Sequence, residues 1–280
     1  MARTSIYKSA DQLRRMVAPG RITADALNAV LSAVRAGVTT LELDAIAEAS
    51  IRAAGAEPNF MLVPGYRHTI CASVNDEVVH GIPGGRVLGA GDIVSIDCGA
   101  QFEGWNGDSA LTVVLPDASR PDIVAERAEL SHVTEQSLWA GIAALSTARH
   151  LNQVGEAIED YVEGKASGGV AYGILEDYVG HGIGRSMHED PPVFNYRVRG
   201  RGPTVKAGLV VAIEPMITLG GSIDTRVHDD EWTVLTADGA AAAHWEHSVA
   251  VHDGGIWVLT AHDGGAAGLA PFGVTPVPIA

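Results

Sequence analysis

The chain has 280 residues, of which 34 are acidic and 19 are basic, and its formal net charge is −15. This charge argues against a general affinity for nucleic-acid phosphates or anionic membrane surfaces, and it leaves room for cationic ligands such as metal ions or peptide amines. With 46% hydrophobic and 19% charged residues, the composition is that of a folded chain with a core.

The first sixty residues have the pattern of helices. We expect a short helical segment within residues 1–20 and an amphipathic helix over residues 26–34. Thr39 and Glu42 fit a capping box, and apolar residues then recur at helical spacing until Gly55, which stands at the position of a C-terminal cap.

From residue 60 to residue 115, short β-branched runs alternate with Gly, Pro and Asn-Asp, a pattern typical of antiparallel strands and hairpins. A second helical region follows. It opens at Pro121 with an acid in its first turn, continues to about Ala148, and is succeeded by a helix over about 151–165. Strands return in four further runs, at 208–217, 231–238, 244–251 and 256–260.

This order of helices, strands, helices and strands predicts an α+β fold made of two halves of similar texture. We expect residues 1–263 to form one domain. Residues 264–280 carry no charged side chain and are rich in Gly and Pro, so we expect a tail that lies on the body or is loose in solvent.

The two cysteines, Cys71 and Cys98, are too few for a disulfide framework. The N-terminal stretch has no apolar segment of the signal-peptide type, and the longest apolar runs are too short to span a bilayer. We therefore expect a cytoplasmic protein.

Acids placed in apolar strands are the most informative feature of the sequence. Asp97 ends the run DIVSID, and Asp108 follows eleven residues later across a GWNG-type turn, so a hairpin can bring both carboxylates to one face. Glu214 ends VVAIE, Glu246 lies in HWEHSV, and His181 lies among glycines. A buried carboxylate costs several kcal/mol unless it is paired or bound to metal. The set therefore predicts a site for two divalent ions.

Each of these residues also has an ordinary structural interpretation. A lone Asp at the end of a strand is more often a turn or cap residue, and a lone His in a Gly-rich loop is more often structural. The loop GHGIGR at 180–185 has the glycines of a phosphate loop without the required spacing. As a set, however, the four acids and one imidazole favour a metal site.

The sequence resembles the type I methionine aminopeptidases. Five blocks match that family in order, over roughly residues 10 to 260: SVNDEVVHGIP (73–83), GDIVSIDCGAQFEGWNGDSA (91–110), GHGIGRSMHEDPPV (180–193), AIEPM (212–216) and EHSVAV (246–251). The resemblance implies the pita-bread fold, a pseudo-twofold α+β domain with a curved antiparallel sheet, outer helices and a site between its halves.

Carried over residue by residue, the family's metal ligands are Asp97, Asp108, His181, Glu214 and Glu246. The resemblance implies two divalent ions, with Asp108 and Glu246 bridging them, Asp97 on one ion, and His181 with Glu214 on the other. Such a ligand set suits Mn, Fe, Co or Zn.

The resemblance also implies an activity, the removal of the initiator methionine when the second residue is small. A hydroxide activated by two metals would attack the scissile carbonyl, with Glu214 as the proton shuttle. His80 would hydrogen-bond the substrate near the scissile amide, and His188 would contact its carbonyl oxygen.

The expected methionine pocket departs from the family. Bacterial members usually have Tyr-His-Gly-Tyr-Pro where this chain has Val63-Pro64-Gly65-Tyr66-Arg67, so an aromatic, a histidine and a proline are replaced. The other pocket positions keep a largely apolar character, which suits an unbranched thioether: Phe60, Tyr66, Cys71, Met187 and Trp232.

His244 stands two residues before Glu246, where the family more often has glutamine, and strand alternation would place the two side chains on one face. We expect His244 to contact the metal ligands without binding the ions itself, with plain packing as the alternative. His247 should point to the opposite face.

Two other functions stay open. An Xaa-Pro peptidase shares the fold but usually carries a separate N-terminal domain, and a pita-bread domain can also bind peptides without catalysis. The expected partners are N-termini of nascent polypeptides. Contact with the ribosome is left open, nucleic-acid specificity and membrane association are not expected, and we expect a monomer.

Overall fold

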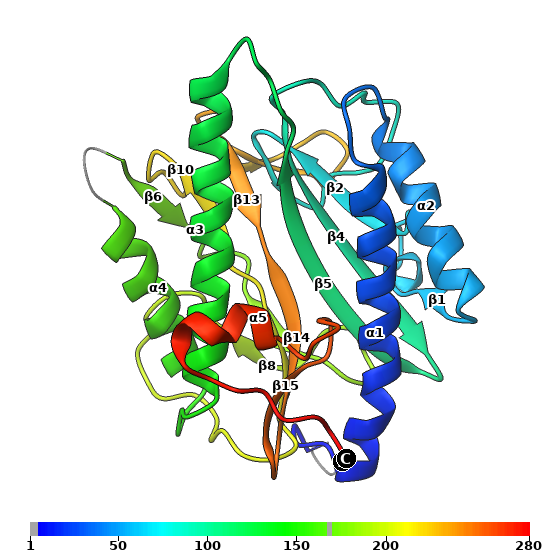
Figure 1. Ribbon diagram of the computed structural model, residues 1–280, viewed down its shortest axis with the longest axis vertical. Coiled ribbons are helices and arrows are strands. Elements are labelled where there is room, and N and C mark those ends of the chain that lie inside the picture. The colour runs from blue at the N-terminus through cyan, green and yellow to red at the C-terminus, as the bar shows by residue number, and fades with distance from the viewer. Residues whose placement is uncertain (1–4, 167–169) are drawn as a thin grey trace.

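The computed structural model describes residues 5–166 and 170–280. Its centre is a curved antiparallel sheet of nine strands in the order β1-β4-β5-β14-β9-β7-β8, with β2 paired to β4 and β15 paired to β14 (Figure 1). The bounds are β1 Glu57–Pro58, β2 Ile70–Val74, β4 Ile93–Phe102, β5 Trp105–Val114, β7 Gly180–Gly182, β8 Glu189–Val193, β9 Val210–Ile213, β14 Glu246–His252 and β15 Gly255–Val258.

Two three-stranded sheets flank this centre, in the orders β13-β10-β6 and β11-β12-β3. Their bounds are β3 Glu77–Val79, β6 Tyr172–Ile174, β10 Met216–Leu219, β11 Thr225–Val227, β12 Val234–Thr236 and β13 Ala242–His244.

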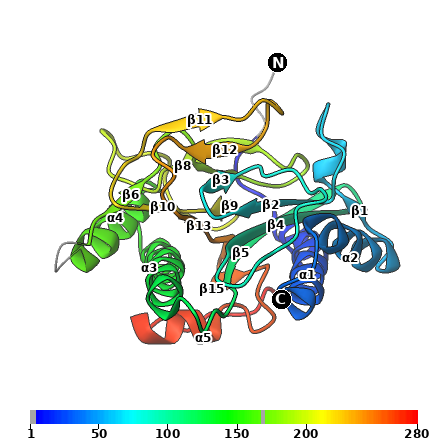
Figure 2. The same ribbon diagram turned by 90° about the horizontal axis from the view of Figure 1, so that it is seen from above.

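The long helices lie on one side of the main sheet as two pairs, α1 with α2 and α3 with α4, and the sheet of β11, β12 and β3 lies on the other side (Figure 2). The helices are α1 Ala10–Ala33, α2 Thr40–Ala53, α3 Pro121–Leu145, α4 Gln153–Lys165 and α5 Ala266–Leu269, with 3-10 turns η1 Phe60–Leu62 and η2 Ala270–Phe272. The α+β pita-bread architecture expected from the sequence is confirmed.

The capping box at the start of α2 is present: Thr39 accepts from the backbone of Glu42, and the Glu42 carboxylate accepts from Thr39 N–H. The two separate helical stretches expected before it are wrong, because α1 is one continuous helix. Pro19 and Gly20, both weak helix formers, lie inside it. Packing explains the glycine, since a Cβ at Gly20 would lie 2.6 Å from the carbonyl oxygen of Leu259.

The β4–β5 hairpin turns at Glu103 and Gly104, whose φ angles of 50° and 72° are those of a two-residue left-handed turn. The expected turn over Gly104–Gly107 is therefore wrong by two residues, because β5 already begins at Trp105. Asp97 pairs with Ala110, and Asp108 lies two residues along β5 from that partner. Both carboxylates thus share one face, as expected.

Two of the expected strands are interrupted. The run 208–217 divides into β9 and β10 at Glu214 and Pro215, and the run 244–251 divides into β13 and β14 at Trp245. At both breaks the chain passes between the main sheet and the sheet of β13, β10 and β6. Glu214 and His244 stand at this junction, which brings them together.

The last residues lie on the body. Leu269 is fully buried in the cluster under α3, Val277 N–H donates to the carbonyl of Ile256 at 2.9 Å, and Arg14 donates to the carbonyl of Ala280 at 3.0 Å. Among the described residues, no helix has the length and apolar character needed to cross a membrane.

Candidate functional site

A cavity of about 180 Å³ is lined in part by side chains from strands β4, β5, β7 and β14 of the main sheet. It has an acidic end and an apolar end. Every residue predicted to hold metal, contact the substrate or form the methionine pocket lines it: Phe60, Tyr66, Cys71, His80, Asp97, Asp108, His181, Met187, His188, Glu214, Trp232 and Glu246. His244, which was expected only to support the metal ligands, is not part of the lining. Val63 and Val79 complete the lining.

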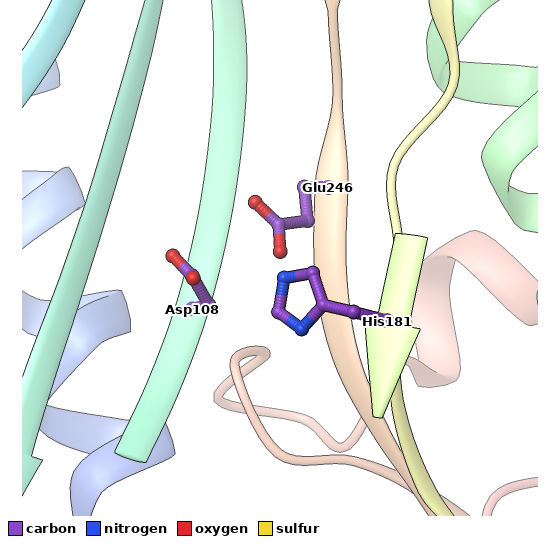
Figure 3. A group of neighbouring side chains, drawn as sticks. All are labelled: Asp108, His181 and Glu246. Atoms are coloured by element: carbon purple, nitrogen blue, oxygen red, sulfur yellow. The ribbon is translucent and has the colours of Figure 1, made fainter. Parts of the chain in front are cut away.

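Strands β4, β5, β7, β9 and β14 each contribute one side chain to the acidic end, from within the strand or directly after it. Asp108 on β5, His181 on β7 and Glu246 at the start of β14 point toward one another (Figure 3). Each offers a ligand atom, and the three atoms lie within 4.8 Å of one another. Asp97 on β4 and Glu214 directly after β9 line the same end.

Hydrogen bonds between β5 and β14 hold this register. Ser248 accepts from Asp108 N–H at 3.1 Å and donates to the Asp108 carbonyl at 2.8 Å. Ser109 donates to the carbonyl of Glu246 at 2.6 Å. The backbones that carry Asp108 and Glu246 are therefore fixed to one another without use of their carboxylates.

The imidazole of His181 is oriented in the same way. Its Nδ1 lies 3.0 Å from the carbonyl of Gly182 and donates to it, which leaves the Nε2 lone pair free. That Nε2 lies 3.5 Å from Oε1 of Glu214. An imidazole oriented by a backbone carbonyl is the usual state of a metal-binding histidine.

Burial strongly disfavours the charged form of all four acids. It raises the pKa of Asp97 to about 7, with the neighbouring Glu214 carboxylate adding to the rise and His244 opposing it. Burial likewise raises the pKa of Glu214 to about 7. For Asp108 and Glu246, burial together with the adjacent carboxylates raises the pKa well above its usual value.

Several polar atoms at this end have no hydrogen-bond partner within the described part of the chain. Oδ1 of Asp97, Oδ1 of Asp108 and Oε1 of Glu246 are buried in this state. Buried polar atoms are normally paired, since leaving one unpaired costs about 1–3 kcal/mol. Cations would neutralise these oxygens and coordinate them, so the residues present fit a divalent metal centre.

Two further histidines border the acidic end. His188 lies with its ring centroid 4.3 Å from that of His181. His80 follows β3 with a left-handed φ of 61° and stacks edge-on against Tyr178 at 5.6 Å. Burial lowers the pKa of His188, and it lowers the pKa of His80 to about 4. Both imidazoles are therefore neutral near pH 7 and able to donate one hydrogen bond.

The apolar end is built from the turn η1, from loops and from the start of strand β2. Phe60, Tyr66 and Cys71 form a buried cluster against which Met187 and Trp232 pack. Tyr66 donates to the carbonyl of Ile70 at 2.7 Å, and its ring meets Trp232 edge-on at 5.1 Å. Val63, which the sequence placed in the altered stretch of the expected pocket, packs against this cluster. Val79 also lines the cavity and was not predicted. The ordinary apolar character of Val79 gave no sequence signal for this position.

His244, at the end of β13, and His247, on β14, point to different places. Nε2 of His244 is 3.6 Å from Oε2 of Glu214, at the acidic end. His247 lies on the helix side, with Nδ1 2.8 Å from Oγ1 of Thr260 and its ring 4.9 Å from Trp139. The expected opposite direction of His247 is confirmed.

Asn195 is a residue that sequence reasoning missed. It is fully buried, and its amide donates to the carbonyl of Glu214 at 3.1 Å. This bond satisfies the backbone at the point where β9 ends and the chain turns at Pro215. An asparagine in a polar loop gave no sequence signal for that contact.

The fold and the site define a class of metallopeptidase. The model of metallopeptidase family M24 matches residues 14–253, and the chain belongs to this family. It is 49% identical over 255 residues to methionine aminopeptidase 1 of Mycobacterium tuberculosis, a match that covers 90% of this chain and 94% of that protein.

Solved structures agree. The crystal structure of methionine aminopeptidase from Rickettsia prowazekii superposes with a TM-score of 0.82 at 33% identity, covering 91% of this chain and 99% of that one. The prolidase of Pyrococcus furiosus superposes with a TM-score of 0.68 at 19% identity, and 65% of that chain is covered. The second likeness shows the shared fold alone.

Proposed function

We propose that this chain is a methionyl aminopeptidase that removes the N-terminal methionine from peptides and proteins, with preference for a small second residue. The observation that carries the proposal is the cavity of about 180 Å³, which joins unsatisfied carboxylates at one end to an apolar pocket at the other. The relatives named methionine aminopeptidase, matched over most of their length, support the same activity.

Five side chains would hold two divalent ions: Asp97, Asp108, His181, Glu214 and Glu246. Mn, Fe, Co and Zn would all suit this mixture of carboxylate oxygens and one imidazole nitrogen. When bound there, such ions would lower the pKa of a coordinated water and would polarise the scissile carbonyl.

The remaining chemistry belongs to the chain's own side chains. Glu214, whose pKa is raised by burial to about 7 in the protein without metal, takes a proton from the attacking water and returns it to the leaving amine. Neutral His188 donates to the carbonyl oxygen as negative charge develops there. Neutral His80 hydrogen-bonds the substrate near the scissile amide.

The apolar end would hold the methionine side chain. Phe60, Tyr66, Cys71, Met187 and Trp232 surround a space that offers a thioether no charged partner, and Met187 supplies a soft contact of its own. The substrates would be N-termini of nascent chains in the cytoplasm, with the enzyme acting as a monomer. Contact with the ribosome is compatible with this role.

The test uses the full chain, stripped of metal with a strong chelator and assayed with Met-Ala-Ser and with Ala-Pro peptides. We expect cleavage of Met-Ala-Ser only after Mn²⁺ or Co²⁺ is added back. Full activity in the metal-free protein would overturn the mechanism. Preference for Ala-Pro would identify an Xaa-Pro peptidase, and tight metal binding without cleavage of either peptide would identify a binding domain.

A further inference from the structure

His244 is held in place by its backbone rather than by its side chain. Its N–H lies 3.0 Å from Oγ1 of Thr112 and 3.2 Å from Oγ of Ser95, and its carbonyl accepts from the Thr112 hydroxyl at 2.7 Å. The two hydroxyls are themselves 2.8 Å apart. His244 is 1% exposed. Its imidazole therefore extends from a fixed backbone position and has no access to bulk water.

The imidazole nitrogen Nε2 is unsatisfied. It is buried and finds no hydrogen-bond partner among residues 5–166 and 170–280. The acid in front of it is Glu214, whose Oε2 lies 3.6 Å away. This separation exceeds the roughly 2.7–3.2 Å of an N–H···O hydrogen bond. A buried nitrogen that faces a carboxylate and has no hydrogen-bond partner in the described residues is suited to coordinate a metal ion.

His181 provides an internal standard for that distance. Its Nε2 stands 3.5 Å from the other oxygen of Glu214, so one carboxylate faces two imidazoles at nearly equal separations. Two ligand atoms that each lie about 2.1 Å from one tetrahedral ion are about 3.4 Å apart. His244 therefore has the spacing of a co-ligand of Glu214.

Glu246 belongs to both candidate groups of metal ligands, and each group includes one of the two imidazoles. Ligand atoms of Asp108, His181 and Glu246 lie within 4.8 Å of one another, and so do those of Glu214, His244 and Glu246. The described residues thus form two overlapping groups that share Glu246, and each group contains one nitrogen.

We propose that His244 is a sixth metal ligand, which binds through Nε2 the ion held by Glu214 and Glu246. This inference rests on the metal centre of the proposed function. Because the related enzymes more often have glutamine at this position, the added nitrogen should shift metal preference. Imidazole suits Zn and Co, whereas Mn favours oxygen ligands.

The test is equilibrium metal binding to the chelated full chain, with Co²⁺ and Mn²⁺ as separate probes and the visible absorption of Co²⁺ as the coordination readout. We compare wild type with His244→Gln, and with His247→Gln as the matched control on the helix side of the main sheet. We expect His244→Gln to lose at least ~10-fold in Co²⁺ affinity. It should lose less for Mn²⁺ and show a changed Co²⁺ spectrum, while His247→Gln leaves all three quantities unchanged.

An unchanged Co²⁺ spectrum in His244→Gln would overturn the proposal, including the case in which both metals weaken equally because a supporting hydrogen bond is lost. If the variant does not fold, the imidazole ¹⁵N signals of wild type titrated with Zn²⁺ give the answer. A metal-induced shift at Nε2 of His244 supports coordination, and a missing shift refutes it. Failure of wild type to bind any metal would instead refute the proposed function.

Discussion

The two ends of the cavity are stabilised in different ways. At the acidic end, Asp97, Asp108 and Glu246 leave buried oxygens without partners in the described residues, so this end is complete only with cations. At the apolar end, Phe60 and Tyr66 pack edge-on at 6.4 Å, and Tyr66 satisfies its hydroxyl with the Ile70 carbonyl. The end proposed to carry out the chemistry is therefore the one that the protein alone leaves unsatisfied.

The two ends also rest on different parts of the fold. The acids stand in strands or directly beside them, and strand pairing fixes the position of each acid to within about one residue. Apart from Cys71 on β2 and Val79 on β3, the apolar wall comes from η1, from the segment that follows it, and from the loops that carry Met187 and Trp232. A change of sequence at the apolar end can therefore alter substrate selection while the acidic end stays intact.

The largest effect is expected from Asp108→Asn, which keeps the shape of the side chain but removes a charge. Loss of a residue that supports a metal ligand typically costs up to ~100-fold in metal affinity, so loss of a proposed ligand itself should reduce metal affinity and peptide cleavage by at least ~100-fold. Metal content after dialysis and Met-Ala-Ser hydrolysis measure this. Glu48→Gln is the control, since Glu48 pairs with Arg52 on the surface of α2. Wild-type metal content in Asp108→Asn would contradict the assignment.

Glu214→Gln tests the cost of the acidic end to stability. In metal-free wild type, the pKa of Glu214 is raised from 4.5 to about 7. Its contribution to the free energy of unfolding is therefore full below pH 4.5 and is lost as the pH rises through 7. The free energy of unfolding of the metal-free variant should therefore rise relative to that of wild type across this pH window, by on the order of 3 kcal/mol at pH 8.

Urea unfolding of both chelated proteins at pH 5 and pH 8 measures that gain. Saturating Mn²⁺ should reverse the order at pH 8, because the ion binds the folded wild type more tightly than the variant. A difference in stability that does not change with pH would show that Glu214 is not held protonated in the metal-free fold.

The contrast between strands and loops also explains what sequence could predict. Asp97, Asp108, Glu214 and Glu246 could be found because each interrupts an apolar strand pattern, and pairing then needs to be right only to one residue. The continuous α1 was missed because the local cost of Pro19 and Gly20 is overridden by packing against the body.

Contacts between segments far apart in the chain gave no sequence signal. Lys8 forms a 2.7 Å ion pair with Glu189, which also accepts from Ser186 N–H and so ties down the loop that carries Met187 and His188. The interruption at Trp245 is another example. It depends on two sheets meeting there, and local alternation predicted a continuous strand.

A smaller effect is expected at the apolar end from Trp232→Ala. Removing this wall should lower kcat/KM for Met-Ala-Ser by about 10- to 100-fold, the range associated with lost apolar contacts in a pocket. Metal affinity should not change, because Trp232 touches Tyr66 rather than the acids. Trp232→Phe should recover part of the loss. Metal loss in Trp232→Ala would show that the two ends are not independent.

The smallest effect concerns Val63, which lines the cavity and stands where the resemblance to type I methionine aminopeptidases predicts an aromatic residue. A smaller side chain leaves the first-residue pocket looser, so wild type should discriminate only weakly between peptides that begin with Met, norleucine or Leu. Val63→Tyr should raise the preference for Met over Leu by up to about 10-fold in kcat/KM. Leu62→Tyr is the matched control, since Leu62 is its neighbour in sequence and is 50% exposed. Strong selectivity for Met in wild type, unchanged in Val63→Tyr, would show that the wall at Val63 does not select the substrate and that selection rests on Tyr66, Met187 and Trp232.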